Sequence, residues 1–339
     1  MMNNKSKGPV KPPLVTIVTP SYNQAKYLEF TMRSVLEQDY PWLEYIVVDG
    51  GSNDGSQDII RKYAEHLAWW ISEPDAGQAD AIHKGMAKAH GEIVAWLNSD
   101  DLLLPEAVSQ AVQSLKESPQ VGMVYGNAIT IDAQGCPINQ LVFSDWGLKE
   151  FVGFRIICQP AVFMRRKFYE EAGGLARDFH FMLDHHLWIR IARLAPVKFV
   201  PKFWAAARHH LAAKNVSQAA AFGRETLRVL EWMKTQPDLA QLIAANPRFV
   251  TAGAQRLNAR YLLDGDQFTQ ALKAYAQALA ADPLYTLKHW HRMMYAILCL
   301  LGLKNLRKIH SRLTQRQPRV RWSDLGIKSW PGLNLDQGS

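Results

Sequence analysis

The sequence is poor in cysteine, and its apolar runs are short. Its 339 residues include three cysteines, none of them in a Cys-x-x-Cys pair: Cys136, Cys158 and Cys299. This spacing argues against a zinc ribbon or a disulfide framework, and it fits a reducing compartment. The most apolar stretch, residues 293–303, is shorter than the roughly 20 residues of a membrane-spanning helix. We therefore expect a buried helix there, or one that lies in a membrane interface.

The N-terminus has no apolar core of the kind that a signal peptide needs, so we expect residues 1–12 to form a flexible lead-in.

Lysine and arginine number 39 against 31 acidic residues, which gives a net charge of +8. This excess suits an anionic partner such as a nucleotide, a nucleic acid or an acidic membrane surface. The basic tail over residues 304–321 is compatible with peripheral membrane contact. The tail contains no recognisable nucleic-acid-binding motif, so we expect no nucleic-acid partner.

Strand and helix patterns alternate over the first half of the chain. Short β-branched or aromatic runs predict strands at residues 14–20, 45–49, 68–72, 92–97 and 121–126, with amphipathic helices between them. This order predicts an α/β fold with a mostly parallel sheet and helices on both faces. From about residue 220 the pattern becomes helical. Residues 265–283 resemble the second helix of a tetratricopeptide repeat, with an apolar face of Ala271, Tyr275 and Ala278. A single such unit is expected to pack on the first domain.

Polar loops follow four of the predicted strands. They read TPSYN, DGGSNDGS, SEPDAGQ and NSDD, and the carboxyl ends of parallel strands meet at one sheet edge, where ligands bind. Asp49 ends the second strand and can accept a hydrogen bond from a base or a ribose, although an ordinary turn explains it equally well. An EF-hand is excluded, because Asp54 and Ile60 stand where Gly and Glu are required. A P-loop is excluded by the missing lysine.

The NSDD loop ends an apolar strand with two adjacent carboxylates. Asp100 and Asp101 are hard oxygen donors of the kind that Mg²⁺ or Mn²⁺ prefers. An alternative is a pair of charges at the start of the following helix, where the helix dipole favours them. The loop alone does not decide between these two interpretations.

Three segments together resemble a known family. They are VTIVTPSYNQAKYLEFTMRSVLEQDYPWLEYIVVDGGSNDGS, then NSDD, then LDHHLWIRIA, and they are similar to the inverting nucleotide-sugar glycosyltransferases of family 2, which have the GT-A fold. The resemblance covers about residues 12–218. It implies a GT-A domain over residues 13–219, followed by a helical region with the basic tail over residues 220–339.

The resemblance also implies a donor site. It places the nucleotide against Thr19, Pro20, Tyr22, Asp49, Asp75, Asp80, Lys84 and Asp100. It implies that Asp100 and Asp101 bind the metal, Mg²⁺ or Mn²⁺. Asn98 stands where the family usually has aspartate. His210, in the segment that resembles the family's R-x-H motif, is a further candidate ligand; a structural role for this histidine remains equally open.

The catalytic base implied by the resemblance is Asp184. In LDHHLW, Leu183 and His186 replace the two other acidic residues of the family motif. The alternative role for Asp184 is a helix N-cap. Gln159, Trp188 and Arg208 are assigned to the acceptor or sugar side.

The implied reaction is metal-dependent transfer, with inversion, from a UDP-, GDP- or dTDP-sugar to a glycan or lipid-linked acceptor. Relatives of this kind build bacterial surface polysaccharides, so we expect a cytoplasmic protein, including one held peripherally at the inner face of the plasma membrane. A nucleotidyltransferase is disfavoured, because TPSYNQAKY has no glycine. A non-catalytic relative or a scaffold that uses the helical tail is the remaining alternative, and it predicts that Asp100, Asp101 and Asp184 are dispensable.

Overall fold

The first half of the chain forms parallel strands joined by helices. The computed structural model describes residues 11–210, 214–303 and 321–333. Four strands lie in the order β3-β2-β1-β4 and pair in parallel: β1 (Val15–Ser21), β2 (Leu43–Asp49), β3 (Trp69–Ser72) and β4 (Ile93–Trp96). Their register places Ser21 beside Asp49 and Asp49 beside Ser72. The polar loops after these strands therefore meet at one edge, as predicted.

Beyond β4 the sheet is mixed. β8 (Val162–Arg165) runs antiparallel to both β4 and β6 (Met123–Ile131), and β9 (Val197–Arg208) runs parallel to β6. β5 (Leu102–Leu103) pairs antiparallel with β9, and β7 (Pro137–Leu141) forms a hairpin with β6. A short turn can join only antiparallel neighbours, which explains the direction of β7. The predicted parallel arrangement thus describes the first four strands, and the second half differs from it.

Helices cover both faces of the sheet because buried side chains alternate along the strands. Val15 and Ile17 of β1 pack on one face with α1 (Ala25–Leu36), α2 (Ser56–Lys62) and α4 (Ala107–Glu117). Val18 points to the other face, which is covered by α3 (Gln78–Met86), α5 (Leu148–Val152), α6 (Arg166–Glu171) and α7 (Leu183–Leu194). Short 3-10 turns occupy Ala64–His66 and Gln159–Ala161.

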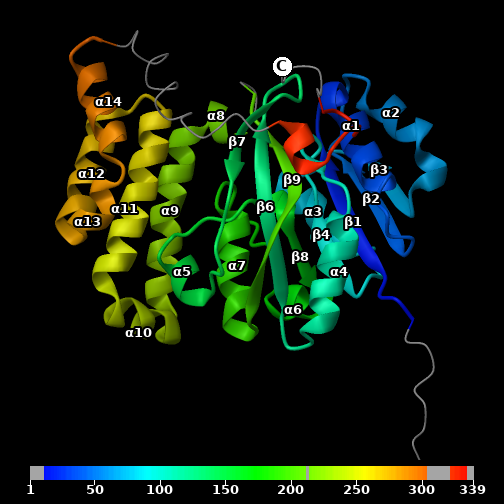
Figure 1. The fold of residues 1–339 in the computed structure, drawn as a ribbon, viewed down its shortest axis with the longest axis horizontal. Helices are drawn as coiled ribbons and strands as arrows, with labels where there is room; N and C mark the ends of the chain where they lie inside the picture. Colours follow the sequence, from blue (N-terminus) through cyan, green and yellow to red (C-terminus); the bar gives the residue numbers. More distant parts are fainter. Residues whose placement is uncertain (1–10, 211–213, 304–320, 334–339) are drawn as a thin grey trace, which may run out of the picture.

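Residues 214–303 form a helical region that lies beside the sheet (Figure 1). The helices are α8 (Lys214–Ser217), α9 (Ala219–Thr235), α10 (Pro237–Ala245), α11 (Pro247–Asp264), α12 (Phe268–Ala281), α13 (Pro283–Leu287) and α14 (Trp290–Leu300). Val229 and Met233 of α9 belong to the same apolar core as Val18 of β1, so α9 completes the cover of that face. None of the helices in the described ranges has both the length and the apolar character that a membrane crossing needs.

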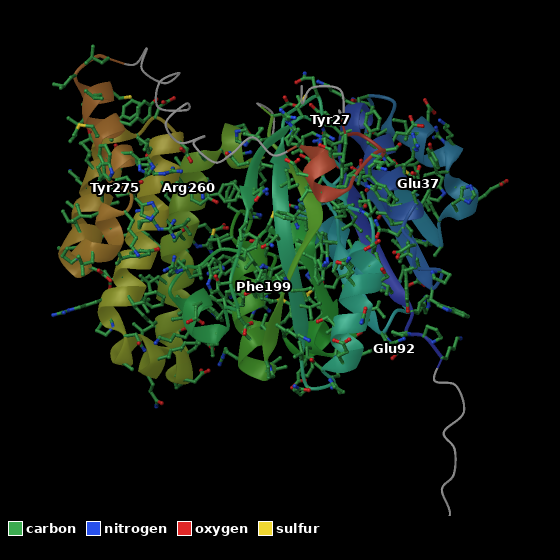
Figure 2. All side chains as sticks on the ribbon, in the orientation of Figure 1. Tyr27, Glu37, Glu92, Phe199, Arg260 and Tyr275 are labelled. Carbon is green, nitrogen blue, oxygen red and sulfur yellow. The ribbon has the colours of Figure 1, made fainter. Side chains whose placement is uncertain are left out.

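α12 has the apolar face that its sequence predicts. Ala271, Tyr275 and Ala278 are buried. The first two share an apolar cluster with side chains of α11 and α14, and Figure 2 labels Tyr275 among these helices. The likeness to a tetratricopeptide unit and the domain division at residue 219 stay predictions.

Residues 321–333 return to the sheet. Trp322, in a 3-10 turn over Trp322–Leu325, packs with Leu102 and Ala206, and Trp330 Nε1 donates to the Leu103 carbonyl at 2.6 Å. This segment covers the sheet edge at β5, an arrangement that the sequence did not indicate. The basic run itself, over residues 304–320, lies outside the described residues.

Candidate functional site

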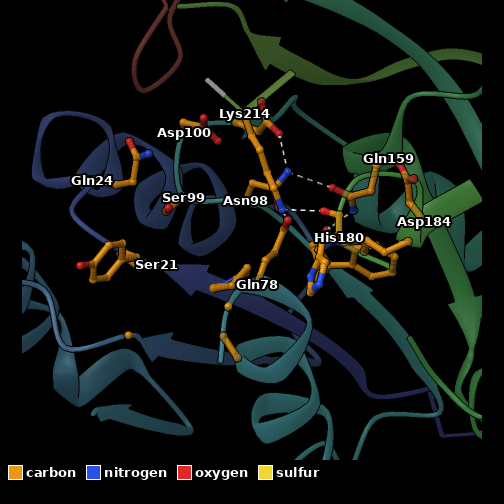
Figure 3. A pocket seen from close by; sticks show the side chains of 18 of the residues that line it. Ser21, Gln24, Gln78, Asn98, Ser99, Asp100, Gln159, His180, Asp184 and Lys214 are labelled. Atoms are coloured by element: carbon orange, nitrogen blue, oxygen red, sulfur yellow. Dashed lines mark hydrogen bonds between the residues drawn. The ribbon is translucent and has the colours of Figure 1, made fainter. Parts of the chain in front are cut away.

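A cleft of about 840 Å³ opens at the edge where the first four strands end. Its walls come from the polar loops, from the start of α7 and from the helical region (Figure 3). Eight residues expected at the site line it: Pro20, Tyr22, Asp75, Asp100, Asp101, Gln159, Asp184 and Arg208. The structure therefore brings residues separated by almost 190 positions into one cavity.

One side of the cleft has a carboxylate beside an exposed aromatic ring. Tyr22 is 63% exposed, and the Asp75 carboxylate accepts the Gly77 N–H at 2.7 Å. A Cβ on Gly50 would lie 2.8 Å from Asp75 Oδ2 and 3.3 Å from the Tyr22 ring. A side chain at position 50 would therefore displace the Asp75 carboxylate from its present place. Together they form an open surface suited to a planar, hydrogen-bonding ligand.

Asp49 and Thr19 lie behind this surface, and neither is among the cleft-lining residues of the described chain. The fully buried Asp49 accepts three hydrogen bonds, from Ser52 N at 2.8 Å, Ser52 Oγ at 2.5 Å and Ser72 Oγ at 2.7 Å. Thr19 shares a 2.9 Å hydrogen bond with the Tyr45 hydroxyl. In this structure Asp49 therefore shapes the glycine turn, and its oxygens are directed to serines of the protein.

Asp80 and Lys84 also lie outside the cleft lining. Lys84 Nζ lies 2.8 Å from a Glu73 carboxylate oxygen and 3.8 Å from Asp80, and Arg177 lies 3.5 Å from Asp80. The Lys84–Glu73 ion pair and the hydrogen bond from Lys84 to the Pro74 carbonyl tie the loop after β3 to α3, and Asp80 accepts the Ala76 N–H of the same loop at 3.3 Å. Asp80 and Lys84 therefore support the loop that carries Asp75.

Asn98, which replaces an acidic residue of the family motif, connects three side chains. Its amide nitrogen donates to Asp101 Oδ2 at 3.2 Å and to Gln159 Oε1 at 3.3 Å, while its oxygen accepts from Gln78 at 2.7 Å (Figure 3). Gln159 in turn donates to the Trp96 carbonyl at 2.7 Å. A carboxylate could not make the two donations, so asparagine fits this network specifically.

The two carboxylates of the loop differ in environment. Asp101 is 7% exposed and accepts the Arg208 backbone N–H at 2.8 Å; burial, followed by the charge of Asp100, raises its pKa to about 8. Asp100 lines the cleft, and its Oδ2 lies 3.0 Å from His210 Nε2. The Arg208 side chain donates to the Asp100 carbonyl at 2.9 Å and stacks over Tyr27. The arginine thus fixes the loop, and His210 pairs with its outward carboxylate.

Asp184 lies in the first turn of α7, which begins at Leu183 and has Met182 as its N-cap residue, so Asp184 is not the helix cap. It lines the cleft, and its Oδ1 accepts the His185 N–H at 2.7 Å. Burial is the main cause that raises its pKa to about 6, and the negative charge of Glu225 adds to this effect. Lys214, which also lines the cleft, acts in the opposite direction. A carboxylate of this pKa can exchange a proton near neutral pH.

Glu225 was missed by the sequence reasoning. It projects from α9, is 4% exposed, and accepts the backbone N–H groups of His180, Phe181 and Met182 at 2.9, 2.5 and 2.7 Å. From the other side, Lys214 Nζ donates to the His180 carbonyl at 2.5 Å. The loop that leads into Asp184 is therefore held by two charged groups. A carboxylate on the apolar face of a helix was the available sequence signal.

Two neighbours of Asp184 in the sequence point away from the cleft. His186 stacks on Phe179 at 4.3 Å between ring centroids, and burial lowers its pKa to about 3. Trp188, which was expected on the sugar side, is 1% exposed and stacks on Trp96 at 5.3 Å. Trp96 lines the cleft, so Trp188 supports that wall from behind.

Comparison with known proteins identifies similar sequences and folds. The family model described as Glycosyl transferase family 2 matches residues 16–171. An uncharacterized glycosyltransferase of Mycobacterium tuberculosis is 31% identical over 187 residues, which cover 53% of this chain and 69% of that protein. The putative teichuronic acid biosynthesis glycosyltransferase TuaG of Bacillus subtilis is 38% identical over 108 residues, which cover 31% of this chain and 43% of TuaG.

Among solved structures, the mannosyltransferase PcManGT from Pyrobaculum calidifontis, in complex with GDP-Man and Mn²⁺, matches with a TM-score of 0.57. The match covers 90% of this chain and 86% of that one at 22% sequence identity. At this identity the similarity concerns the fold.

Proposed function

This chain belongs to glycosyltransferase family 2 and has the GT-A fold, and we propose that it moves a sugar from a nucleoside-diphosphate donor to a hydroxyl acceptor with inversion. The observation that supports this most is the placement of Asp184 and Asp100 on the walls of one cleft. Asp184 has a raised pKa that suits a base, and the partly buried Asp100 carboxylate lies beside His210. An inverting displacement needs a single base opposite the leaving group.

We assign the donor to the side formed by Pro20, Tyr22, Asp75 and Asp100, all of which line the cleft. Asp75 would accept hydrogen bonds from the nucleoside, and the exposed Tyr22 ring would cover its planar base. Thr19, Asp49, Asp80 and Lys84 act from behind by shaping these loops. PcManGT was solved with GDP-Man, which makes GDP-sugars one candidate class beside UDP- and dTDP-sugars.

The residues at Asp100 fit Mg²⁺ or Mn²⁺, although no three His, Cys, Asp or Glu side chains of the described chain are grouped so as to hold a metal ion. Such cations are often held by one or two carboxylates together with substrate phosphates and water. Asp100 and His210 would supply the protein ligands, and Asp101 would act through the loop that it stabilises. When bound, the cation would offset the charge of the diphosphate.

Asp184 would take the proton of the acceptor hydroxyl. As that oxygen forms its bond to the anomeric carbon, the bond from this carbon to the donor diphosphate breaks, and the diphosphate leaves with its electron pair. General base catalysis of this kind is commonly worth about 10²–10⁴-fold in rate. Gln159, fixed by Asn98 and Trp96, would contact the sugar or the acceptor. Arg208 and Trp188 act by holding the loop and the wall.

The acceptor is proposed to be a glycan or lipid-linked glycan of a bacterial surface polysaccharide, with the enzyme in the cytoplasm or at the inner face of the plasma membrane. The named role of TuaG in teichuronic acid biosynthesis supports this choice of acceptor.

A donor screen tests the function. The purified protein is incubated with UDP-, GDP- and dTDP-sugars in Mn²⁺, Mg²⁺ or EDTA, and nucleotide release is measured for the wild type, Asp184→Asn and Asp100→Ala. We expect metal-dependent release from one donor class, lost in both variants. Glu231→Gln, an exposed change on α9, is the control. Absence of both release and nucleotide binding in the wild type would identify a non-catalytic relative.

A further inference from the structure

The outermost helices, α13 and α14 (Figure 1), expose several large apolar side chains. Six of these exposed side chains are called the α13–α14 face below. They are Leu284 and Leu287 of α13, Trp290, Met294 and Ile297 of α14, and Leu301, which follows α14. The four from Trp290 onward are spaced by four, three and four positions, so they form one stripe along the helix. A monomer rarely exposes a contiguous apolar patch of this kind without a partner.

The opposite side of α14 is the one that holds it to the protein. Ala296 and Cys299 are buried in a cluster with Ala271 and Tyr275 of α12. The outer stripe therefore adds nothing to this packing, since its residues face away from α12. Helical packing explains one side of α14 and leaves the apolar character of the other side unexplained.

The charge of this part of the chain indicates the partner. Between Asp282 and Asp324 the sequence contains no aspartate or glutamate, and it contains nine lysines and arginines. Lys288, on the surface between α13 and α14, and Arg292 are two of the nine. Most of the others lie within residues 304–320, outside the described part. An exposed apolar stripe with tryptophan, in a segment of sequence whose lysines and arginines have no acidic residue among them, matches the chemistry of an anionic lipid surface.

A second copy of this chain suits the face less well. Two copies joined through α14 would bring together two segments that each carry nine lysines and arginines and no carboxylate of their own; Asp264 of α11 pairs with one of the nine, Arg292, at 3.9 Å. Repulsion between them would oppose the contact, whereas anionic headgroups would attract both the segment and the stripe.

We propose that the α13–α14 face docks on an anionic membrane surface, with Trp290 and its neighbours inserted at the level of the headgroups. In Figure 1, α14 leads toward the same end of the molecule at which β1 finishes and where the strand-end loops of the cleft lie. Docking through α14 would thus hold the enzyme near a lipid-linked acceptor. This consequence rests on the proposed function, while the docking itself needs no sugar donor.

Vesicle co-sedimentation tests the proposal with the full-length protein. Vesicles of phosphatidylcholine with about one-third phosphatidylglycerol are compared with phosphatidylcholine alone. We expect binding to the anionic vesicles, weakening with salt, and a drop of about tenfold or more in the double variant Trp290→Glu, Met294→Glu. Val142→Glu is the matched control, because Val142 is 60% exposed and Trp290 is 61% exposed.

The proposal would be overturned if the wild-type protein did not bind anionic vesicles, or if the double variant bound them as tightly as the wild type. Light scattering adds a further check: a wild-type dimer that the double variant converts to a monomer, with vesicle binding unchanged, would identify a self-interface. Should the glutamates lower the melting temperature, Leu284→Ser with Leu301→Ser replaces them. Nucleotide release without vesicles is measured in parallel, so failure of lipid binding and failure of catalysis are distinguished.

Discussion

Glu225 of α9 accepts the backbone N–H of Met182 at 2.7 Å and thereby connects the helical region to the start of the helix that carries Asp184. The same carboxylate binds the N–H groups of the two preceding residues. Its negative charge also raises the pKa of Asp184, after the larger effect of burial. One side chain therefore holds the loop before the proposed base and also adds to the rise of its pKa.

Glu225→Gln should reduce turnover and shift its pH dependence. The amide has one acceptor oxygen where the carboxylate has two, so the loop before α7 loosens, and we expect a loss of about 10–100-fold in kcat. Removal of the negative charge lowers the pKa of Asp184, so the acid limb of the pH profile should move to lower pH. The pH dependence of nucleotide release measures this. An unchanged acid limb would show that Glu225 has only a structural role.

Lys214→Met should move the acid limb in the opposite direction. The Lys214 ammonium lowers the pKa of Asp184, so its removal raises that pKa and the limb moves to higher pH. Lys234→Met, an exposed change on α9, is the control and should leave the profile as in the wild type. Shifts of the same sign in Glu225→Gln and Lys214→Met would contradict this electrostatic account.

In the wild type, activity should fall as the pH drops through about 6, where Asp184 becomes protonated. Asp184→Asn should lose about 10²–10⁴-fold in kcat at pH 8. Because burial raises the folded-state pKa of Asp184 from its ordinary value of 3.8 to about 6, its ionised form opposes folding in full above about pH 6. This cost declines as the pH falls and is gone only below the ordinary value. The variant should therefore melt at or above the wild-type temperature at pH 8. A clearly lower melting temperature would mean that the loss of activity reflects unfolding.

His210→Ala should weaken metal binding about 10–100-fold, because it removes the neighbour of the Asp100 carboxylate. Isothermal titration calorimetry with Mn²⁺, in the presence of UDP or GDP, measures the affinity of the protein for the metal. His209→Ala is the matched control. Equal affinities in His210→Ala and the wild type would remove His210 from the proposed metal site.

Asn98→Asp should destabilise the protein in EDTA. The new carboxylate would face Asp101 Oδ2, now 3.2 Å from the amide nitrogen, and Gln159 Oε1 would lose its donor. Unsatisfied or repelling buried groups of this kind cost about 1–3 kcal/mol. Mn²⁺ with nucleotide should recover part of the melting temperature. A variant as stable as the wild type in EDTA would show that the Asn98 network contributes little.

The sequence predicted the first four strands well because each is a short apolar run rich in β-branched or aromatic residues. β1 and β4 are buried along their whole length, and the outer strand β3 is half-buried. It missed β5, which has two residues, and β9, where Pro201 and Lys202 interrupt the apolar pattern. The mixed direction of the second half was also missed, because periodicity does not report which strands become neighbours.

For the site, the polar loops indicated its place, and eight of the expected residues do line the cleft. Asp49 and Trp188 were expected to contact the ligand, but Asp49 binds Ser72 and Trp188 stacks on Trp96. These contacts depend on the strand register and on the packing of α7, which the sequence pattern does not report. Glu225 and Lys214 were missed for a similar reason. Their contacts with residues 180–182 join segments more than 30 positions apart, and a pattern within one segment cannot reveal them.

The most direct test of the account is the anomeric configuration of the product. With the donor class found by the screen, proton NMR of an early time course reports whether the new glycosidic bond has the configuration of the donor or the opposite one. A single displacement assisted by Asp184 predicts a product of inverted configuration. In Asp184→Asn, formation of this product should be lost together with nucleotide release. A product that retains the configuration of the donor would contradict the proposed mechanism.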